Sequence, residues 1–351
     1  MTATAGGAPV RRVARPPVVR VGALSVRLAP RGLAAGVGLV AVAAVVAVLA
    51  IGTGDFPVSP PDVIAALTGG GTPAHRFIVG EIRAPRVLTG LLVGAAFGVS
   101  GALFQSVTRN PLGSPDFLGF TAGASTGGIL AVILGGTGWV IAGGSLLGCA
   151  AASLAVYLLS YRRGAHGYRL VLVGAGVAAI LLAVDSYLLT RADIHDAASA
   201  AAWLTGSLSG RGWDHAVPVA LALAVLVPLC APLSRPLRMI EMGDDAAQAM
   251  GIAVERVRLA AVLIGVALCG VATAAAGPVA FVALAAPQLA RRLTGSPGVT
   301  LIASGLMGAV LLILSDLAAQ RVIAPAQLPV GIMTAALGGA YLAWLLRKER
   351  R

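Results

Sequence analysis

Charged side chains are scarce in this chain, and lysine is almost absent. Only 11% of the 351 residues are charged, and Lys348 is the single lysine. A Walker P-loop needs a lysine to reach the nucleotide phosphates, so the chain cannot be its own P-loop ATPase. The three cysteines lie in apolar runs without CxxC or metal-ligand spacing, which excludes a disulfide scaffold and predicts small, buried core residues.

Apolar residues make up most of the chain. They account for 58% of it, and the mean hydropathy of +0.90 is far above that of a soluble globular protein. We predict an all-α polytopic membrane protein with about ten transmembrane helices, each long enough for a ~30 Å hydrocarbon layer. They are expected at 33–52, 87–107, 117–135, 138–160, 170–190, 214–233, 257–277, 278–291, 299–319 and 328–346. The short eighth span should be tilted or shielded by neighbouring protein.

Basic residues are distributed unequally between the connectors. With the N-terminus in the cytoplasm, 20 of the 26 lysines and arginines fall on that side, which agrees with an even number of spans. The net charge of +12 therefore indicates membrane topology rather than nucleic-acid binding. We predict a cytoplasmic basic segment at 1–32, a transmembrane domain at 33–346 and a cytoplasmic tail at 347–351.

Small residues recur at helical spacing in the predicted spans. We interpret them as close helix packing rather than as substrate sites. They are Gly94, Gly98 and Gly101, Gly119, Gly123 and Gly127, and Gly144 and Gly148. The segments at 86–101 and 256–271 also echo each other weakly five spans apart, as inverted repeats of transporters do.

Two enzyme-like motifs lack the context that their chemistry needs. GASTG at 123–127 matches a nucleophile elbow, but no strand is predicted before Ser125 and no histidine base is expected beside it. VLVGAGVAA at 171–179 resembles a dinucleotide fingerprint, but it lies inside one apolar run of membrane length. We expect no catalytic residues. Asp185 and Asp316, the acids nearest the membrane interior, leave a proton-coupled secondary transporter as an alternative.

The long inside loop at 234–256 contains the sequence MGDDAAQAMG. Asp244 or Asp245 is expected to cap a short, alanine-rich helix that ends at Gly251. Such a helix suits docking of a partner, but a solvated loop would have the same pattern. The residues alone leave both interpretations open.

Five motifs in order along the chain resemble the FecCD-type permeases of ABC importers for ferric siderophores, haem and vitamin B12. They are RAPRVLTGLLVGAAFGVSGALFQSVTRNPLGSPDFLGFTAGAS at 83–125, WLTGSLSGRGW at 203–213, GDDAAQAMGIAVERVRL at 243–259, AAGPVAFVALAAPQLARR at 275–292 and QLPVGIMTAALGG at 327–339. The resemblance implies a BtuC-like type II importer permease of ten helices in the bacterial plasma (inner) membrane.

The same resemblance implies partners and a substrate. A second permease subunit would complete the translocation path, two cytoplasmic ATPase subunits would bind ATP and Mg, and an extracytoplasmic protein would deliver the substrate. No cofactor is implied for this chain itself. RNPLGSPDFLGF and related stretches look closest to ferric-enterobactin permeases, which favours a catecholate siderophore and a paralogous second permease. Vitamin B12 and haem are the alternative substrates.

The resemblance implies a docking role for arginines in the outside connector before the second predicted span. Arg83 and Arg86 correspond to family arginines that pair with acidic residues of the binding protein. Exposed guanidinium groups suit this role because they bind carboxylates in a bidentate manner. A third family arginine falls at Gln320 here, and the adjacent Arg321 completes the predicted docking set of Arg83, Arg86 and Arg321.

At the inner side, Asn110 and Leu112 match the family's cytoplasmic gate. The facing gate positions fall at Gly167 and Tyr168, where the vitamin B12 permease has small hydroxyl residues. Gln288 stands where the family often has histidine, and the sequence assigns it no role. The family's ATPase-coupling helix matches Gly243, Asp244, Asp245, Gln248 and Gly251.

Overall fold

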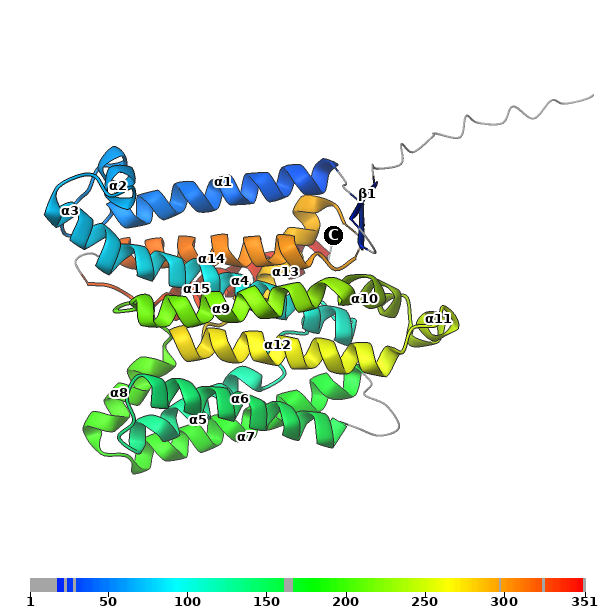
Figure 1. Ribbon diagram of the computed structural model, residues 1–351. Coiled ribbons are helices and arrows are strands. Elements are labelled where there is room, and N and C mark those ends of the chain that lie inside the picture. Colours follow the sequence, from blue (N-terminus) through cyan, green and yellow to red (C-terminus); the bar gives the residue numbers. More distant parts are fainter. Residues whose placement is uncertain are drawn as a thin grey trace, which may run out of the picture.

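The computed structural model describes residues 18–21, 24–27, 30–160, 167–296, 298–323 and 326–349, which form a bundle of long helices (Figure 1). A helix lies at each of the ten predicted positions, so the predicted all-α membrane architecture is confirmed. They are α1 (Pro30–Gly52), α4 (Ala84–Thr108), α5 (Phe120–Ile133), α6 (Trp139–Ser160), α7 (Gly167–Arg191), α9 (Trp213–Cys230), α12 (Val254–Ala276), α13 (Val282–Thr294), α14 (Leu301–Arg321) and α15 (Val330–Glu349). Among the described residues, seven helices are long and apolar enough to cross a membrane.

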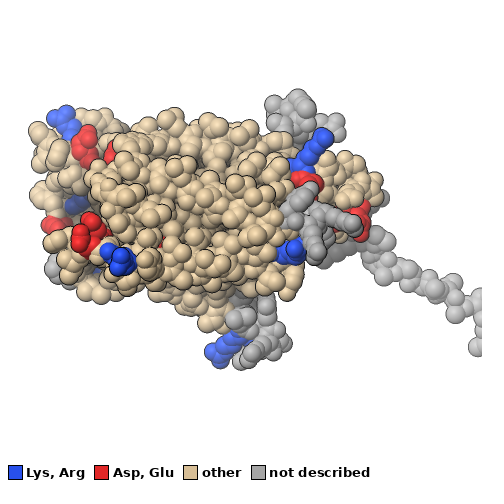
Figure 2. All heavy atoms as spheres, turned by 90° about the horizontal axis from the view of Figure 1, so that it is seen from below, with Lys and Arg blue, Asp and Glu red and all other residues tan. Residues whose placement is uncertain are grey.

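Short elements gather at the two ends of the bundle (Figure 1). At the end predicted to face outward lie α2 (Pro60–Leu67), α3 (Pro73–Phe77), the π-helix η1 (Ile78–Arg83) and α8 (Ile194–Leu204). At the other end lie α10 (Ser234–Glu241), which the 3-10 helix η2 (Ala231–Leu233) joins to α9, and α11 (Asp244–Ala249). Figure 2 shows charged side chains near both ends and an uncharged band between them, as a membrane-spanning bundle requires.

A small hairpin precedes α1 and was not predicted. Strands β1 (Val18–Val21) and β2 (Leu24–Arg27) pair antiparallel, with Val18 opposite Arg27. Four of the eight strand residues are valine, three of them in β1, and β-branched residues favour this conformation. Most of the predicted 1–32 segment, the arginines of the loop 161–166 and the last two residues of the tail lie outside the described residues, so their cytoplasmic placement stays a prediction.

Helix α4 is central in the bundle. Most of its side chains are buried, and it packs against α14, α12, α13 and α9. The carbonyl oxygens of Ser304 in α14 and Ala283 in α13 occupy the space where side chains at Gly98 and Gly101 would begin. The contact between α5 and α6 is built from glycines in the same way. The interpretation of these glycines as packing residues is confirmed.

Helices α5 and α13 are too short to cross the layer alone. They contain 14 and 13 residues, about 20 Å each at 1.5 Å per residue. The buried side chains of α13 confirm the shielding expected for the eighth span. For α5 the prediction of 117–135 was too long, because Gly119 takes a left-handed conformation (φ +80°) before the helix begins. The echoing segments at 86–101 and 256–271 lie in α4 and α12, which run in opposite directions through the bundle. One short helix follows each of them: α5 follows α4, and α13 follows α12.

Candidate gate, coupling and docking sites

Arg83 lies in η1, which runs without a break from α3 into α4. Its Nη1 donates to the carbonyl of Ile51 at 2.8 Å, and its Nη2 donates to the carbonyl of Phe56 at 2.8 Å. Ile51 belongs to the last turn of α1, where carbonyls have no partner within the helix. Arg83 therefore caps the C-terminal end of α1, and its docking role stays a prediction.

Arg86 is bound to α14 by a bidentate ion pair. Its Nε and Nη2 donate to the two carboxylate oxygens of Asp316 at 3.1 and 2.9 Å, and its Nη1 donates to Gln327 at 3.0 Å. Gln320 gives Asp316 a third donor at 2.8 Å. The side chains of Arg86 and Asp316 are 16% and 1% exposed. No local sequence signal pairs these residues, because 230 positions separate them.

Arg321 is the exposed member of the predicted docking set. It is the last residue of α14, and it forms no hydrogen bond or ion pair within the described part of the chain. Its guanidinium is therefore available to a carboxylate of another protein, unlike those of Arg83 and Arg86.

The second intramembrane acid, Asp185, also has a partner in another helix. Its Oδ1 accepts a hydrogen bond from Thr126 Oγ1 at 2.5 Å, which joins α7 to α5. Asp185 and Asp316 thus each stabilise a helix contact. Interhelical hydrogen bonds of this kind are a common way to hold membrane helices together.

Asn110 and Leu112 form a tight turn after α4. Arg109 ends that helix in a left-handed conformation (φ +50°), and Asn110 Oδ1 accepts the amide of Leu112 at 2.9 Å. Leu112 is 50% exposed, as an apolar constriction at the end of a path would be. Tyr168, in the first turn of α7, is 78% exposed, and no hydrogen bond within the described residues joins it to this turn. Gly167 is the first residue of α7.

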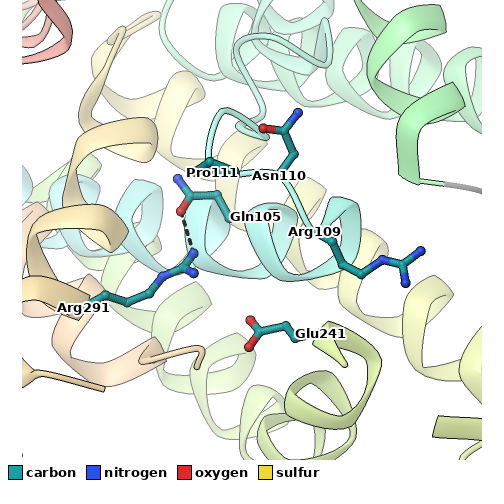
Figure 3. A pocket seen from close by; sticks show the side chains of 6 residues that line it. All are labelled: Gln105, Arg109, Asn110, Pro111, Glu241 and Arg291. Atoms are coloured by element: carbon teal, nitrogen blue, oxygen red, sulfur yellow. Dashed lines mark hydrogen bonds between the residues drawn. The ribbon is translucent and has the colours of Figure 1, made fainter. Parts of the chain in front are cut away.

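A cleft of about 200 Å³ opens beside this turn (Figure 3). Most of its lining residues were not predicted: beside Asn110 it is lined by Gln105, Arg109 and Pro111, by Glu241 of α10 and by Arg291 of α13. Glu241 also accepts a hydrogen bond from Ser106 at 2.5 Å. The polar residues of QSVTRN at 105–110, where the largely apolar α4 ends, were the one signal that the sequence offered.

Helix α11 projects at the end of the bundle that is predicted to face the cytoplasm (Figure 1). The expected cap at Asp244 or Asp245 was wrong: Gly243, with φ +124°, precedes the helix, and both acids lie in its first turn. Asp244 instead accepts Arg258 Nη2 at 3.0 Å on both oxygens and lies 3.8 Å from Arg109 Nη1. Gly251, with φ +80°, follows the helix as predicted.

Comparison with known proteins decides the family. Residues 41–348 match the model of the FecCD transport family. This chain belongs to the FecCD transport family. It is 44% identical over 314 residues to the ferric enterobactin transport system permease protein FepG of Escherichia coli K12, covering 89% of this chain and 95% of that protein.

Two further similarities agree with this assignment. The achromobactin permease CbrC of Dickeya dadantii is 38% identical, with 87% of this chain and 88% of CbrC covered. A metal-chelate type ABC transporter solved in an inward-facing conformation is 27% identical and superposes with a TM-score of 0.79, over 89% of this chain and 98% of that one. As a FecCD member, the chain is a multi-pass inner-membrane permease of an iron-chelate ABC importer and not an enzyme. An ABC importer is driven by ATP, which a separate subunit hydrolyses. The proton-coupled secondary transporter is therefore excluded as an alternative.

Proposed function

We propose that this chain is one permease subunit of an importer for ferric catecholate siderophores of the enterobactin type. The 44% identity to FepG over 89% of the chain carries this proposal. Relatives at lower identity are named for ferric hydroxamate or ferric dicitrate. The chemical class of the chelate is therefore the part of the proposal that needs a transport measurement.

In the proposed assembly, a paralogous permease completes the translocation path. An extracytoplasmic siderophore-binding protein docks at the outer end. Two ATPase subunits that bind ATP and Mg dock at the inner end, the side on which this proposal also puts both termini. Asn110, Leu112 and Tyr168 narrow the inner end of the path. The contact surface for one ATPase is α11 with its flanking glycines: Gly243, Asp244, Asp245, Gln248 and Gly251.

The proposed coupling runs from α11 to the gate. Asp244 lies in the first turn of α11 and beside Arg109, the residue directly before Asn110. A displacement of α11 by ATPase closure would act on the gate turn through this charge contact and through the Asp244 pair with Arg258 of α12. Movement of the apolar Leu112 would then wet or dry the constriction.

Uptake of radio-iron from ferric enterobactin tests the substrate. Iron-starved cells that lack this chain should lose ATP-dependent uptake, and the chain should restore it. Labelled vitamin B12 is measured in parallel as the control chelate. Loss of vitamin B12 uptake with unchanged iron uptake would overturn the catecholate proposal, and a loss confined to haem would do the same.

Replacing Arg321 with glutamate should slow association with the binding protein about tenfold at low salt, because an outer-face charge acts mainly on the encounter rate. Arg191→Glu is the matched control, since Arg191 is also an exposed arginine at the outer end of a spanning helix. Surface plasmon resonance with the reconstituted complex measures both variants. Equal rates for the two would remove Arg321 from the docking surface. Arg86→Glu is unsuitable here because it would face Asp316.

A further inference from the structure

Gln105, a buried residue near the inner end of α4, is the centre of a polar cluster with α13 (Figure 3). Its Nε2 donates to the carbonyl of Leu284 at 3.0 Å. Its Oε1 accepts Nη2 of Arg291 at 2.9 Å and Nε2 of Gln288 at 3.3 Å. The amide thus has partners for both its oxygen and its nitrogen, and a satisfied polar cluster in the interior fixes how two helices meet.

Gln288 extends this cluster to the loop 109–119. Its Nε2 also donates to the carbonyl of Pro111 at 2.8 Å, in the middle of the predicted gate sequence NPL. Near the other end of the loop, a carboxylate oxygen of Asp116 accepts the amide of Phe281 at 3.3 Å. Phe281 is the residue directly before α13. The loop is therefore attached to α13 at two separate points.

We propose that α13 and the loop 109–119 move as one body when the gate operates, and that Gln288 is the positioning residue that joins them. This inference rests on the proposed importer function. The Gln288 amide touches both α4 and the loop, so a shift of the loop that left α13 in place would break the bond to Pro111. A displacement of α11, transmitted through Asp244 and Arg109, would accordingly reach α13 as well.

Substitutions at Gln288 separate this role from simple packing. Gln288→Glu keeps the size of the side chain but removes the N–H donor, and Gln288→His restores one. In the complete importer reconstituted in lipid, we expect Gln288→Glu to lower uptake per ATP hydrolysed about fivefold, the effect of one lost hydrogen bond. Amide hydrogen exchange in the loop 109–119 should accelerate by a similar factor. Gln288→His should recover most of both readouts.

Two neighbouring arginines supply a matched control. Arg291 donates to Gln105, whereas Arg292 lies over the ring of Trp344 at 5.6 Å. Arg291→Gln should accelerate exchange in the loop, and Arg292→Gln, with the same change of charge on the same helix, should not. The joint movement would be overturned if Arg291→Gln and Arg292→Gln had equal exchange rates in the loop. An unchanged exchange rate in Gln288→Glu would overturn it as well. Failure of the unmodified importer to transport ferric enterobactin would instead refute the substrate proposal, because the exchange measurement does not depend on transport.

Discussion

Replacing Gly98 with leucine should abolish the folded permease. A Cβ at this position would collide with the carbonyl oxygen of Ser304, and the obstacle is helix backbone rather than a movable side chain. Relief requires α4 and α14 to separate, which removes the close contact that associates helices in lipid. We expect a cost above ~3 kcal/mol, the upper end of overpacking penalties. Size-exclusion chromatography and thermal unfolding in detergent measure the loss.

Gly143→Leu is the control for this substitution. Gly143 lies in α6, another long apolar helix, but a Cβ there meets nothing within 4 Å. The protein should therefore retain its yield and its melting temperature. If the two leucine variants lost equal amounts of folded protein, the added leucine side chain itself would be the cause rather than a collision with Ser304. The packing argument would then be wrong.

Replacing Asp316 with alanine should lower the free energy of unfolding by about 3–5 kcal/mol, the range for breaking a buried ion pair. Asp316→Ala leaves the mostly buried guanidinium of Arg86 without its bidentate partner and also strips Gln320 of its acceptor. Denaturant or thermal unfolding of the purified chain reports the change. Asp316→Asn, which keeps one acceptor oxygen, should lose less.

A double substitution tests whether the two residues act as a pair. Arg86→Met with Asp316→Leu removes both charges and keeps comparable volume, and such replacements are often neutral. We expect the double variant to be more stable than Asp316→Ala. Strictly additive losses from Arg86→Met and Asp316→Leu would show that the pair contributes no coupling energy. A binding-protein assay on the stable double variant then isolates any docking contribution of Arg86.

The sequence predicted the helices well because apolar runs in lipid must form helices of a limited length. It located all ten, and it identified the glycines that allow close contact. Its errors have local physical reasons. The span at α5 was too long because left-handed Gly119 precedes the helix, and the cap of α11 was misplaced because Asp244 turns its carboxylate toward Arg258.

The sequence by itself determined the membrane class, the family, the need for a separate ATPase and the positions of the spans, because these depend on composition, hydropathy period and motif order. Only the tertiary structure decided what the polar side chains touch. Arg86 meets Asp316, and Gln288 meets Pro111, across 230 and 177 positions of chain. Such partners follow from how helices pack in three dimensions, and no pattern along one chain records them.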